Sequence, residues 1–196
     1  MSLIKAEYWE QRYTSGETDW DLKSATPAFL DILNDIILAG KEKLLVPGCG
    51  FGYDAVAAAK KGFDVTAIDI STTAIEQAKK LVMEELKIKF IRQDFFLLDE
   101  KNKFDIIYDY VTYCAIDPGR RKEYAGKVAA LLNKEGIFIA IFFPVENRNF
   151  GPPFGVDIIE AENLFGKELE LVVSTNKINS IKSRAGREYL QIYMKK

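Results

Sequence analysis

A glycine-rich stretch at residues 46–52, with the sequence VPGCGFG, is the segment whose residue types point most directly to chemistry. It follows a short apolar run and precedes an alanine-rich run, so we expect it to connect a strand to a helix. Glycines let the backbone approach a ligand closely, and free N–H groups at a helix start favour a carboxylate or phosphate. The stretch therefore predicts a nucleotide-binding loop that includes Gly48 and Gly50, with an ordinary tight turn as the alternative.

Asp69 strengthens the ligand-binding interpretation. It stands 21 residues after Gly48, at the end of the next predicted strand, where a carboxylate accepts hydrogen bonds from the two hydroxyls of a ribose. The alternative is that Asp69 caps the following helix, although Ser71 or Thr73 is also suited to that position. Together, the glycine-rich stretch and Asp69 predict a cofactor that contains adenosine, without identifying it.

The chain contains no histidine, which removes the usual general base, the usual zinc ligand and every Ser-His or Cys-His nucleophile pair. We therefore expect no metal site. Its two cysteines, Cys49 and Cys114, lie far apart and have neither metal-type nor disulfide-type spacing. We interpret both as packing residues in a protein of the reducing cytoplasm.

The charges nearly balance, with 27 basic and 29 acidic residues and a net charge of −2. This balance gives no general electrostatic reason to bind nucleic acid or an anionic membrane. The longest apolar stretch, Ile137 to Val145, is too short to span a bilayer, and the N-terminus lacks the apolar run of a signal peptide. We expect a cytoplasmic monomer whose partner is a small-molecule acceptor.

The chemical residues need a framework, and the sequence alternates runs of strand length with helical patterns. The strand-like runs lie at 43–47, 64–70, 88–92, 104–110, 136–143, 169–177 and 188–194. This alternation is typical of βαβ units. We predict one α/β domain over 1–196, a Rossmann-like, doubly wound and mostly parallel seven-stranded sheet with an antiparallel C-terminal strand and helices on both faces. Residues 1–40 are expected to form a helical N-terminal cover and 41–196 the core.

Helix boundaries are also predicted from local signals. Thr73 and Glu76 have the spacing of a capping box, and Asp117 is expected to cap a helix whose buried stripe extends to Leu132. Residues 144–156 contain three prolines and two glycines, which predicts a loop or lid.

Three stretches resemble the thiopurine S-methyltransferase superfamily, and especially its thiol and halide methyltransferase branch. They are LLVPGCGFGYDAVAAAKKGFDVTAIDIS at 44–71, FDIIYDYVTYCAIDPGRRKEYA at 104–125 and GPPFGV at 151–156. The resemblance extends from about Tyr8 to Phe165. It implies S-adenosyl-L-methionine as cofactor, S-adenosyl-L-homocysteine as product, and methyl transfer to a thiopurine, another thiol or a halide ion.

Carried over residue by residue, the resemblance also implies a cofactor site. Trp9, Tyr13 and Trp20 would fold over the cofactor and substrate, although Tyr13 replaces a tryptophan common in this branch. From composition alone, the two tryptophans could equally staple the N-terminus to the core. Gly48 would contact the methionine part of the cofactor, and Asp69 the ribose.

Further along the chain, the resemblance implies adenine and acceptor contacts. Asp94 and Phe95 would hold the adenine, Tyr110 would lie beside the reacting sulfonium, and Arg121 would contact the acceptor. Without the resemblance, a phenylalanine such as Phe95 is more often a core residue than an adenine platform, and Arg121 is equally explained as part of a solvated helix face.

The lack of histidine favours a soft acceptor. A thiol with an ordinary pKa near 8.5 is already partly ionised at neutral pH, and a halide ion carries no proton. A hard acceptor would need help through water, which only Asp109, Tyr110, Tyr113 or Arg121 could offer. With the roles that the resemblance implies for Tyr110 and Arg121, the candidate catalytic residues are Tyr110, Arg121 and Asp109. A small-molecule O- or N-methyltransferase and a non-catalytic cofactor-binding module are the alternatives, while the residues needed for hydride transfer to or from NAD are missing.

Overall fold

The computed structural model describes residues 6–35, 38–82, 85–101, 103–148 and 150–196. The chain forms two compact units, residues 1–98 and 99–196. This division does not follow the expected boundary between a cover over 1–40 and a core over 41–196, and the single-domain organisation stays a prediction. Within the described residues, no helix has the length and apolar character needed to cross a membrane.

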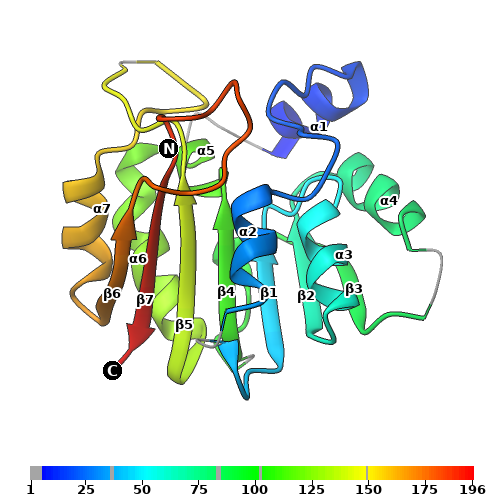
Figure 1. Cartoon of the computed structure of the whole chain (residues 1–196). Coiled ribbons are helices and arrows are strands. Elements are labelled where there is room, and N and C mark those ends of the chain that lie inside the picture. The colour runs from blue at the N-terminus through cyan, green and yellow to red at the C-terminus, as the bar shows by residue number, and fades with distance from the viewer. Residues whose placement is uncertain (1–5, 36–37, 83–84, 102, 149) are drawn as a thin grey trace. The chain divides into compact units, whose positions relative to one another are not determined.

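The first unit contains three parallel strands in the order β3-β2-β1 (Figure 1). They are β1 (Lys43–Pro47), β2 (Asp64–Asp69) and β3 (Ile88–Arg92). The helices are α1 (Ala6–Ser15), α2 (Pro27–Ile32), α3 (Tyr53–Lys60), α4 (Thr72–Lys80) and the short 3-10 helix η2 (Phe95–Leu97). β1 is buried from Leu44 onward, as expected for an apolar strand with neighbours on both faces.

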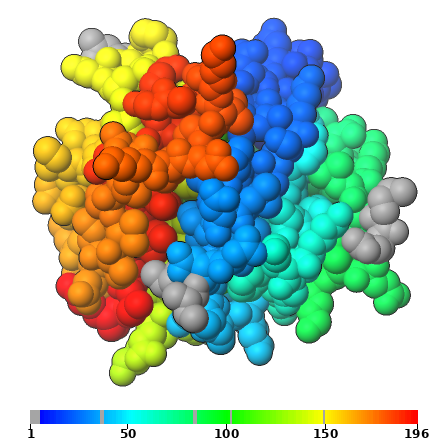
Figure 2. All heavy atoms as spheres, in the orientation of Figure 1, coloured from blue at the N-terminus to red at the C-terminus, as the bar shows by residue number. Residues whose placement is uncertain are grey.

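Hydrogen bonds at the helix starts attach the N-terminal segment to the rest of this unit. Asp54, in the first turn of α3, accepts hydrogen bonds from the backbone N–H and the hydroxyl of Thr26, at 2.6 and 2.8 Å. Thr26 directly precedes α2, so these bonds hold the start of α2 against the start of α3. Figure 2 shows the blue residues of α2 beside the cyan residues of α3.

The predicted capping box at α4 is wrong. The N-cap is Ser71, whose hydroxyl accepts a hydrogen bond from the backbone N–H of Ala74 at 3.1 Å. Thr73 is the second residue of the helix, and its hydroxyl and backbone N–H both donate to Glu10 of α1. The cap therefore lies two residues before the one predicted.

The second unit has four strands in the order β4-β5-β7-β6. They are β4 (Phe104–Tyr110), β5 (Leu132–Phe142), β6 (Leu169–Thr175) and β7 (Tyr189–Lys195). β4 and β5 are parallel, and β7 is antiparallel to both β5 and β6. The helices are α5 (Thr112–Ala115), η3 (Pro118–Arg120), α6 (Arg121–Leu131) and α7 (Ile158–Phe165). The α/β class, with mostly parallel strands and an antiparallel C-terminal strand, is confirmed.

β5 begins four residues earlier than the sequence pattern predicts. Leu132, expected at the end of a helical stripe, instead pairs with Phe104 of β4. An irregularity in the register follows, and Glu135 has a positive φ of 60°. Leu132 is therefore buried as a strand residue, and the helix before it ends at Leu131.

Aromatic rings fill the core of the second unit around Phe165 of α7. The ring centroid of Phe165 lies 4.7 Å from that of Phe138 on β5, 5.4 Å from Tyr193 on β7 and 5.8 Å from Tyr113 on α5. All four side chains are almost fully buried. Since such contacts stabilise beyond the buried area, this cluster holds α5 and α7 in fixed positions.

Gly52 tests how tightly the first unit is packed. A Cβ at this position would lie 2.8 Å from Phe90 and 2.9 Å from Ala78, and the φ of 84° disfavours any other residue. Gly52→Ala should lower the free energy of unfolding by about 3 kcal/mol, from overpacking and backbone strain together. Urea denaturation measures this change.

Gly62→Ala is the matched control, because its φ is also positive, at 98°, but no atom would lie within 4 Å of the new Cβ. It should cost only the backbone strain, about 1 kcal/mol. Equal losses in the two variants would contradict close packing at Gly52.

Candidate functional site

The glycine-rich loop of residues 48–52 connects β1 to α3, as predicted. Gly48, Gly50 and Gly52 have positive φ angles of 55°, 52° and 84°. Three residues with left-handed backbone conformation within a stretch of five turn the chain sharply. Glycine adopts this conformation without the steric cost that a side chain would add. The backbone N–H of Cys49 donates to the carbonyl of Ile68 at 2.9 Å, so the loop is anchored to β2.

Asp69 ends β2, with its carboxylate against this loop. One oxygen accepts a hydrogen bond from the N–H of Gly50 and the other from the N–H of Ser71, each at 2.9 Å. The residue is only 6% exposed, and this burial raises its pKa to about 6 although the two N–H donors oppose the shift. Each oxygen retains acceptor capacity, because a carboxylate oxygen accepts more than one hydrogen bond.

Aromatic side chains of the N-terminal segment lie against the same loop. The ring of Tyr13 packs edge-on against Phe51 at 5.2 Å and Trp20 at 5.5 Å, and Trp9 packs against Trp20 at 5.4 Å. A Cβ added at Gly50 would lie 3.0 Å from the Tyr13 hydroxyl oxygen. Tyr13 is buried, and this burial raises the pKa of its hydroxyl. The three predicted cover residues are thus brought together at the loop.

Glu10 is a residue of this region that the sequence analysis missed. Its carboxylate accepts hydrogen bonds from the hydroxyls of Ser71 and Thr73 at 2.7 and 2.5 Å, and these bonds lower its pKa. The position also suits the positive end of the α4 dipole. Glu10 therefore fastens α1 to the start of α4, the two helices that lie side by side in Figure 1. No sequence pattern links residues so far apart.

Asp94 and Phe95 follow β3 at the start of η2. One oxygen of Asp94 accepts a hydrogen bond from the N–H of Phe96 at 2.9 Å, so Asp94 caps this short helix. Phe95 is 7% exposed and packs edge-on against Phe96. Their proposed contacts with adenine stay a prediction.

In the second unit, Tyr110 ends β4 and lies within a buried polar cluster. Its hydroxyl donates to Glu188 at 2.5 Å and accepts a hydrogen bond from Arg184. Both Arg184 and Glu188 are buried, and neither was predicted as a site residue. Burial raises the pKa of Tyr110 far above its ordinary value, so the hydroxyl is un-ionised at neutral pH.

Asp109, the residue before Tyr110, faces the opposite side of the strand, as alternate strand residues do. Its carboxylate accepts hydrogen bonds from the hydroxyl of Tyr124 at 2.8 Å and from the N–H of Thr112 at 2.9 Å. Burial raises its pKa to about 6. Asp109 thus positions α5 and α6, and its proposed catalytic role stays a prediction.

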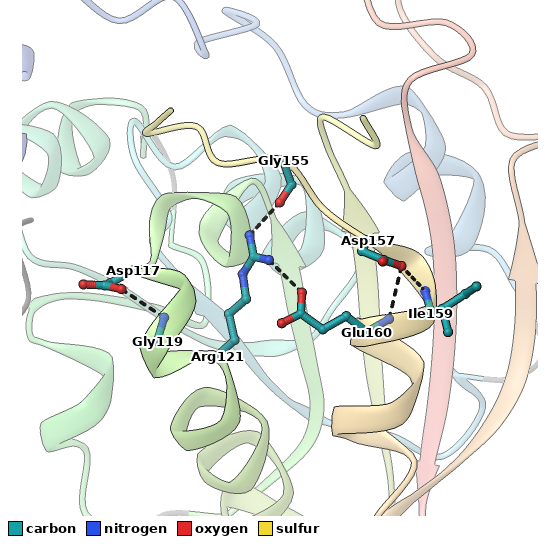
Figure 3. A network of polar contacts seen from close by, with 7 residues as sticks. All are labelled: Asp117, Gly119, Arg121, Gly155, Asp157, Ile159 and Glu160. Atoms are coloured by element: carbon teal, nitrogen blue, oxygen red, sulfur yellow. Dashed lines mark hydrogen bonds and ion pairs between the residues drawn. The ribbon is translucent and has the colours of Figure 1, made fainter. Parts of the chain in front are cut away.

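Arg121 joins the loop after β5 to α7 (Figure 3). Its guanidinium donates to the carbonyl of Gly155 at 2.8 Å and to the carboxylate of Glu160 at 2.9 Å. It also lies 4.7 Å from the centroid of the Tyr113 ring. Arg121 is 4% exposed, so it is not on a solvated helix face.

Two buried polar atoms of these residues, Arg121 Nε and the hydroxyl of Tyr113, have no hydrogen-bond partner among the described residues. An acceptor contact by Arg121 stays a prediction. Its other nitrogens are already committed to Gly155 and Glu160.

The cysteines behave as expected of packing residues. Burial raises the pKa of Cys49, and it raises the pKa of Cys114 to about 12. Both thiols are therefore protonated at neutral pH.

In the described part of the chain, no group of three or more Cys, Asp or Glu side chains is placed to hold a metal ion.

Comparison with known proteins gives a consistent picture. The model of the thiopurine S-methyltransferase (TPMT) family matches residues 4–191. A probable thiol methyltransferase 2 from Arabidopsis thaliana is 37% identical over 84% of this chain and 74% of its own length. Thiocyanate methyltransferase 1 from Brassica oleracea is 34% identical over 93% of this chain and 82% of its own length.

Solved structures confirm the predicted Rossmann-like fold. The N-methyltransferase NodS of Bradyrhizobium japonicum WM9, in complex with S-adenosyl-L-homocysteine, aligns with a TM-score of 0.75 at 16% identity over 98% of this chain and 99% of its own. The magnesium protoporphyrin IX methyltransferase of Synechocystis PCC 6803 aligns with a TM-score of 0.74 at 13% identity, over 97% of this chain and 99% of its own.

The raised pKa of Asp109 makes stability depend on pH. Folding favours the protonated carboxyl of Asp109. The stability that this group contributes is therefore fully present below its unfolded pKa near 4, and it is lost as the pH rises through 6. Asp109→Asn removes this titration while keeping the shape of the side chain. The quantity to follow is the free energy of unfolding of Asp109→Asn minus that of the unchanged protein. This difference should rise by about 3 kcal/mol between pH 4 and pH 7, and urea denaturation of both proteins measures it.

Asp105→Asn is the control, since Asp105 lies at the other end of β4, is only partly buried and accepts a hydrogen bond from Asn133. A pH-independent difference for Asp109→Asn would refute the raised pKa.

Proposed function

The chain belongs to the thiopurine S-methyltransferase family and is an S-adenosylmethionine-dependent methyltransferase, and on that basis we propose that it methylates a small thiol. Thiopurines, other thiols, and halide or thiocyanate ions form the acceptor class. The observation that carries the proposal is that relatives at 37% and 34% identity are named for thiol and thiocyanate methylation, two soft sulfur nucleophiles.

The residues around the glycine loop fit the cofactor. The carboxylate of Asp69 is buried yet keeps acceptor capacity for a ribose, and the backbone at Gly50 lies close beneath Tyr13, whose hydroxyl oxygen would be 3.0 Å from an added Cβ. We propose that Gly48, Gly50 and Asp69 hold the cofactor, with Asp94 and Phe95 at the adenine. Trp9, Tyr13 and Trp20 would cover it and exclude water. When bound, S-adenosylmethionine supplies a methyl group that its sulfonium charge already activates.

Such a donor leaves the protein mainly the tasks of alignment and exclusion of water, worth up to about 7–11 kcal/mol. Tyr110 would lie beside the acceptor with its hydroxyl held un-ionised between Arg184 and Glu188. Arg121 would hold the loop that contains Gly155 and position it against the acceptor. A soft nucleophile suits a chain without imidazole.

A panel of acceptors tests the proposal. The purified protein is incubated with radiolabelled S-adenosylmethionine and with thiols, a thiopurine, thiocyanate, iodide, phenols and amines. We expect transfer to thiols, with activity toward the anions as a further outcome. Transfer only to phenols or amines would identify an O- or N-methyltransferase instead, and binding without any transfer would identify a non-catalytic module.

We also propose that the protein acts as a cytoplasmic monomer without a nucleic-acid partner, in keeping with its net charge of −2. Its mass in solution, measured by light scattering at several concentrations, tests the monomer. A dimeric mass would refute it.

Asp69 gives a test of the cofactor site that does not depend on the acceptor. Asp69→Ala removes a carboxylate that would accept two ribose hydrogen bonds, each worth about 1.5–3 kcal/mol. Affinity for S-adenosyl-L-homocysteine, measured by calorimetry, should fall by about 100-fold or more.

Asp64→Ala, at the opposite end of β2, is the control for a carboxylate of the same strand. It should leave the affinity unchanged. Unchanged affinity in Asp69→Ala would remove Asp69 from the cofactor site, provided that circular dichroism shows both variants folded.

A further inference from the structure

We propose that Glu188 takes the proton that a thiol acceptor loses, and that the hydroxyl of Tyr110 relays it. This inference rests on the proposed function, because it concerns the fate of the thiol proton in that reaction. Methylating a neutral thiol releases one proton, whereas methylating thiocyanate or a halide releases none. A chain without histidine must pass that proton to another group.

The hydrogen bonds around Tyr110 have a fixed direction. An arginine side chain can only donate, so the Tyr110 oxygen must accept from Arg184. The hydroxyl proton is therefore directed at Glu188, whose Oε1 lies 2.5 Å from the Tyr110 oxygen. One lone pair of that oxygen remains, and a thiol S–H can donate to it.

Of Tyr110 and Glu188, Tyr110 is the more exposed residue and therefore the one that an acceptor can reach. Glu188 is 3% exposed and Arg184 is 5% exposed, while Tyr110 is only partly buried. The guanidinium of Arg184 is held over two rings, 4.5 Å from the centroid of Phe143 and 5.2 Å from that of Tyr110. An acceptor that reaches the end of β4 can therefore exchange a proton with Glu188 through the Tyr110 hydroxyl.

The neighbouring charged and titratable groups do not compete for this proton. Arg184 is a permanent cation, and the Cys114 thiol, raised to a pKa of about 12 by burial, stays protonated. Arg187 lies over the Phe143 ring and pairs with Glu146 at 2.7 Å, and as an arginine it cannot accept the proton.

Asp109, the adjacent carboxylate on β4, is directed to the other face of the strand. Its oxygens accept from Tyr124 and Thr112. Glu188 is thus the carboxylate in direct contact with the Tyr110 hydroxyl.

The proposed step balances in atoms and charge. A sulfur lone pair of the thiol forms the new bond to the methyl carbon, and the bond from that carbon to the sulfonium breaks, with its electron pair passing to the departing sulfur. The S–H proton moves to the Tyr110 oxygen while the Tyr110 hydroxyl proton moves to Glu188. The cationic donor and the carboxylate both become neutral, and Glu188 later loses its proton to solvent.

Glu188 acts through Tyr110 and is therefore a positioning residue, so its test must separate proton transfer from structure. Glu188→Gln keeps an oxygen that accepts from Tyr110 but cannot take the proton. At pH 7, kcat for a thiol should fall by up to about 30-fold, because a thiol with a pKa near 8.5 is only about 3% ionised there, and KM should change little. The rate with thiocyanate or iodide should stay within about threefold of the unchanged protein, because these anions carry no proton.

Two further variants sharpen this comparison. Tyr110→Phe removes the relay oxygen but leaves Glu188 in place, and it should show the same selective loss with thiols. Glu168→Gln is the matched control, since Glu168 pairs with Lys195 at the surface at 3.4 Å. It should leave both rates unchanged.

The pH profile provides a readout that a structural defect would not reproduce. In Glu188→Gln, only the preformed thiolate reacts, so the thiol rate should rise about tenfold per pH unit up to the thiol's own pKa near 8.5. The unchanged protein should show a shallower rise.

Binding of an aromatic thiol with S-adenosyl-L-homocysteine in place of the donor gives a second measure without turnover. Its thiolate absorbance should appear at lower pH in Glu188→Gln than in the unchanged protein, because the Glu188 carboxylate disfavours a second negative charge while Arg184 remains in place.

Each outcome is decisive. Loss of thiol activity alone, with recovery at high pH, supports the relay. Equal loss with thiols and anions, or no loss with either, overturns it. If the unchanged protein methylates thiols but no anion, the pH profile and the thiolate absorbance decide. If it methylates no thiol at all, the proposed function fails, and that failure is visible before any variant is compared.

Discussion

A buried carboxylate, Asp69, is the constraint on which the first unit depends. Removing an ionised group from water is costly unless hydrogen bonds compensate, and here the backbone N–H groups of Gly50 and Ser71 provide them. The same two bonds hold the glycine loop after β1 and the turn before α4 in one arrangement. The loop thus acquires its shape from a residue of the neighbouring strand, Asp69, which we also propose to hold the cofactor.

The second unit has a similar buried carboxylate at the end of β4. Asp109 is also buried, and it also accepts a hydrogen bond from the backbone at the start of the following helix, at Thr112. With Asp109 turned inward, strand alternation directs Tyr110 to the other face, where Glu188 and Arg184 meet its hydroxyl. A structural carboxylate and a proposed catalytic hydroxyl are therefore neighbours in sequence with separate tasks.

The lack of histidine limits which side chains near the end of β4 can accept a proton from the acceptor. The described titratable groups near the end of β4 include the Tyr110 hydroxyl and the Cys114 thiol, which burial keeps protonated, and the carboxylates of Glu188 and Asp109, which already have partners. Such surroundings suit an acceptor that reacts as a soft nucleophile. In our proposal, the proton of a thiol then passes through the Tyr110 hydroxyl to the carboxylate of Glu188. The thiol acceptor that we propose is in keeping with both the family membership and this side-chain geometry.

The sequence by itself determined the local features of this protein. β1, β3 and β4 have their predicted bounds because apolar runs between turn residues are a local signal, and the glycine loop and Asp69 were found because their spacing follows from one βαβ unit. Only the tertiary structure decided that Glu10 reaches α4, that Glu188 meets Tyr110 and that Arg121 holds Gly155. These pairs come from segments far apart in the chain. Their contacts depend on how folded elements approach one another, and the same dependence places the start of β5 at Leu132, which pairs with Phe104 of β4.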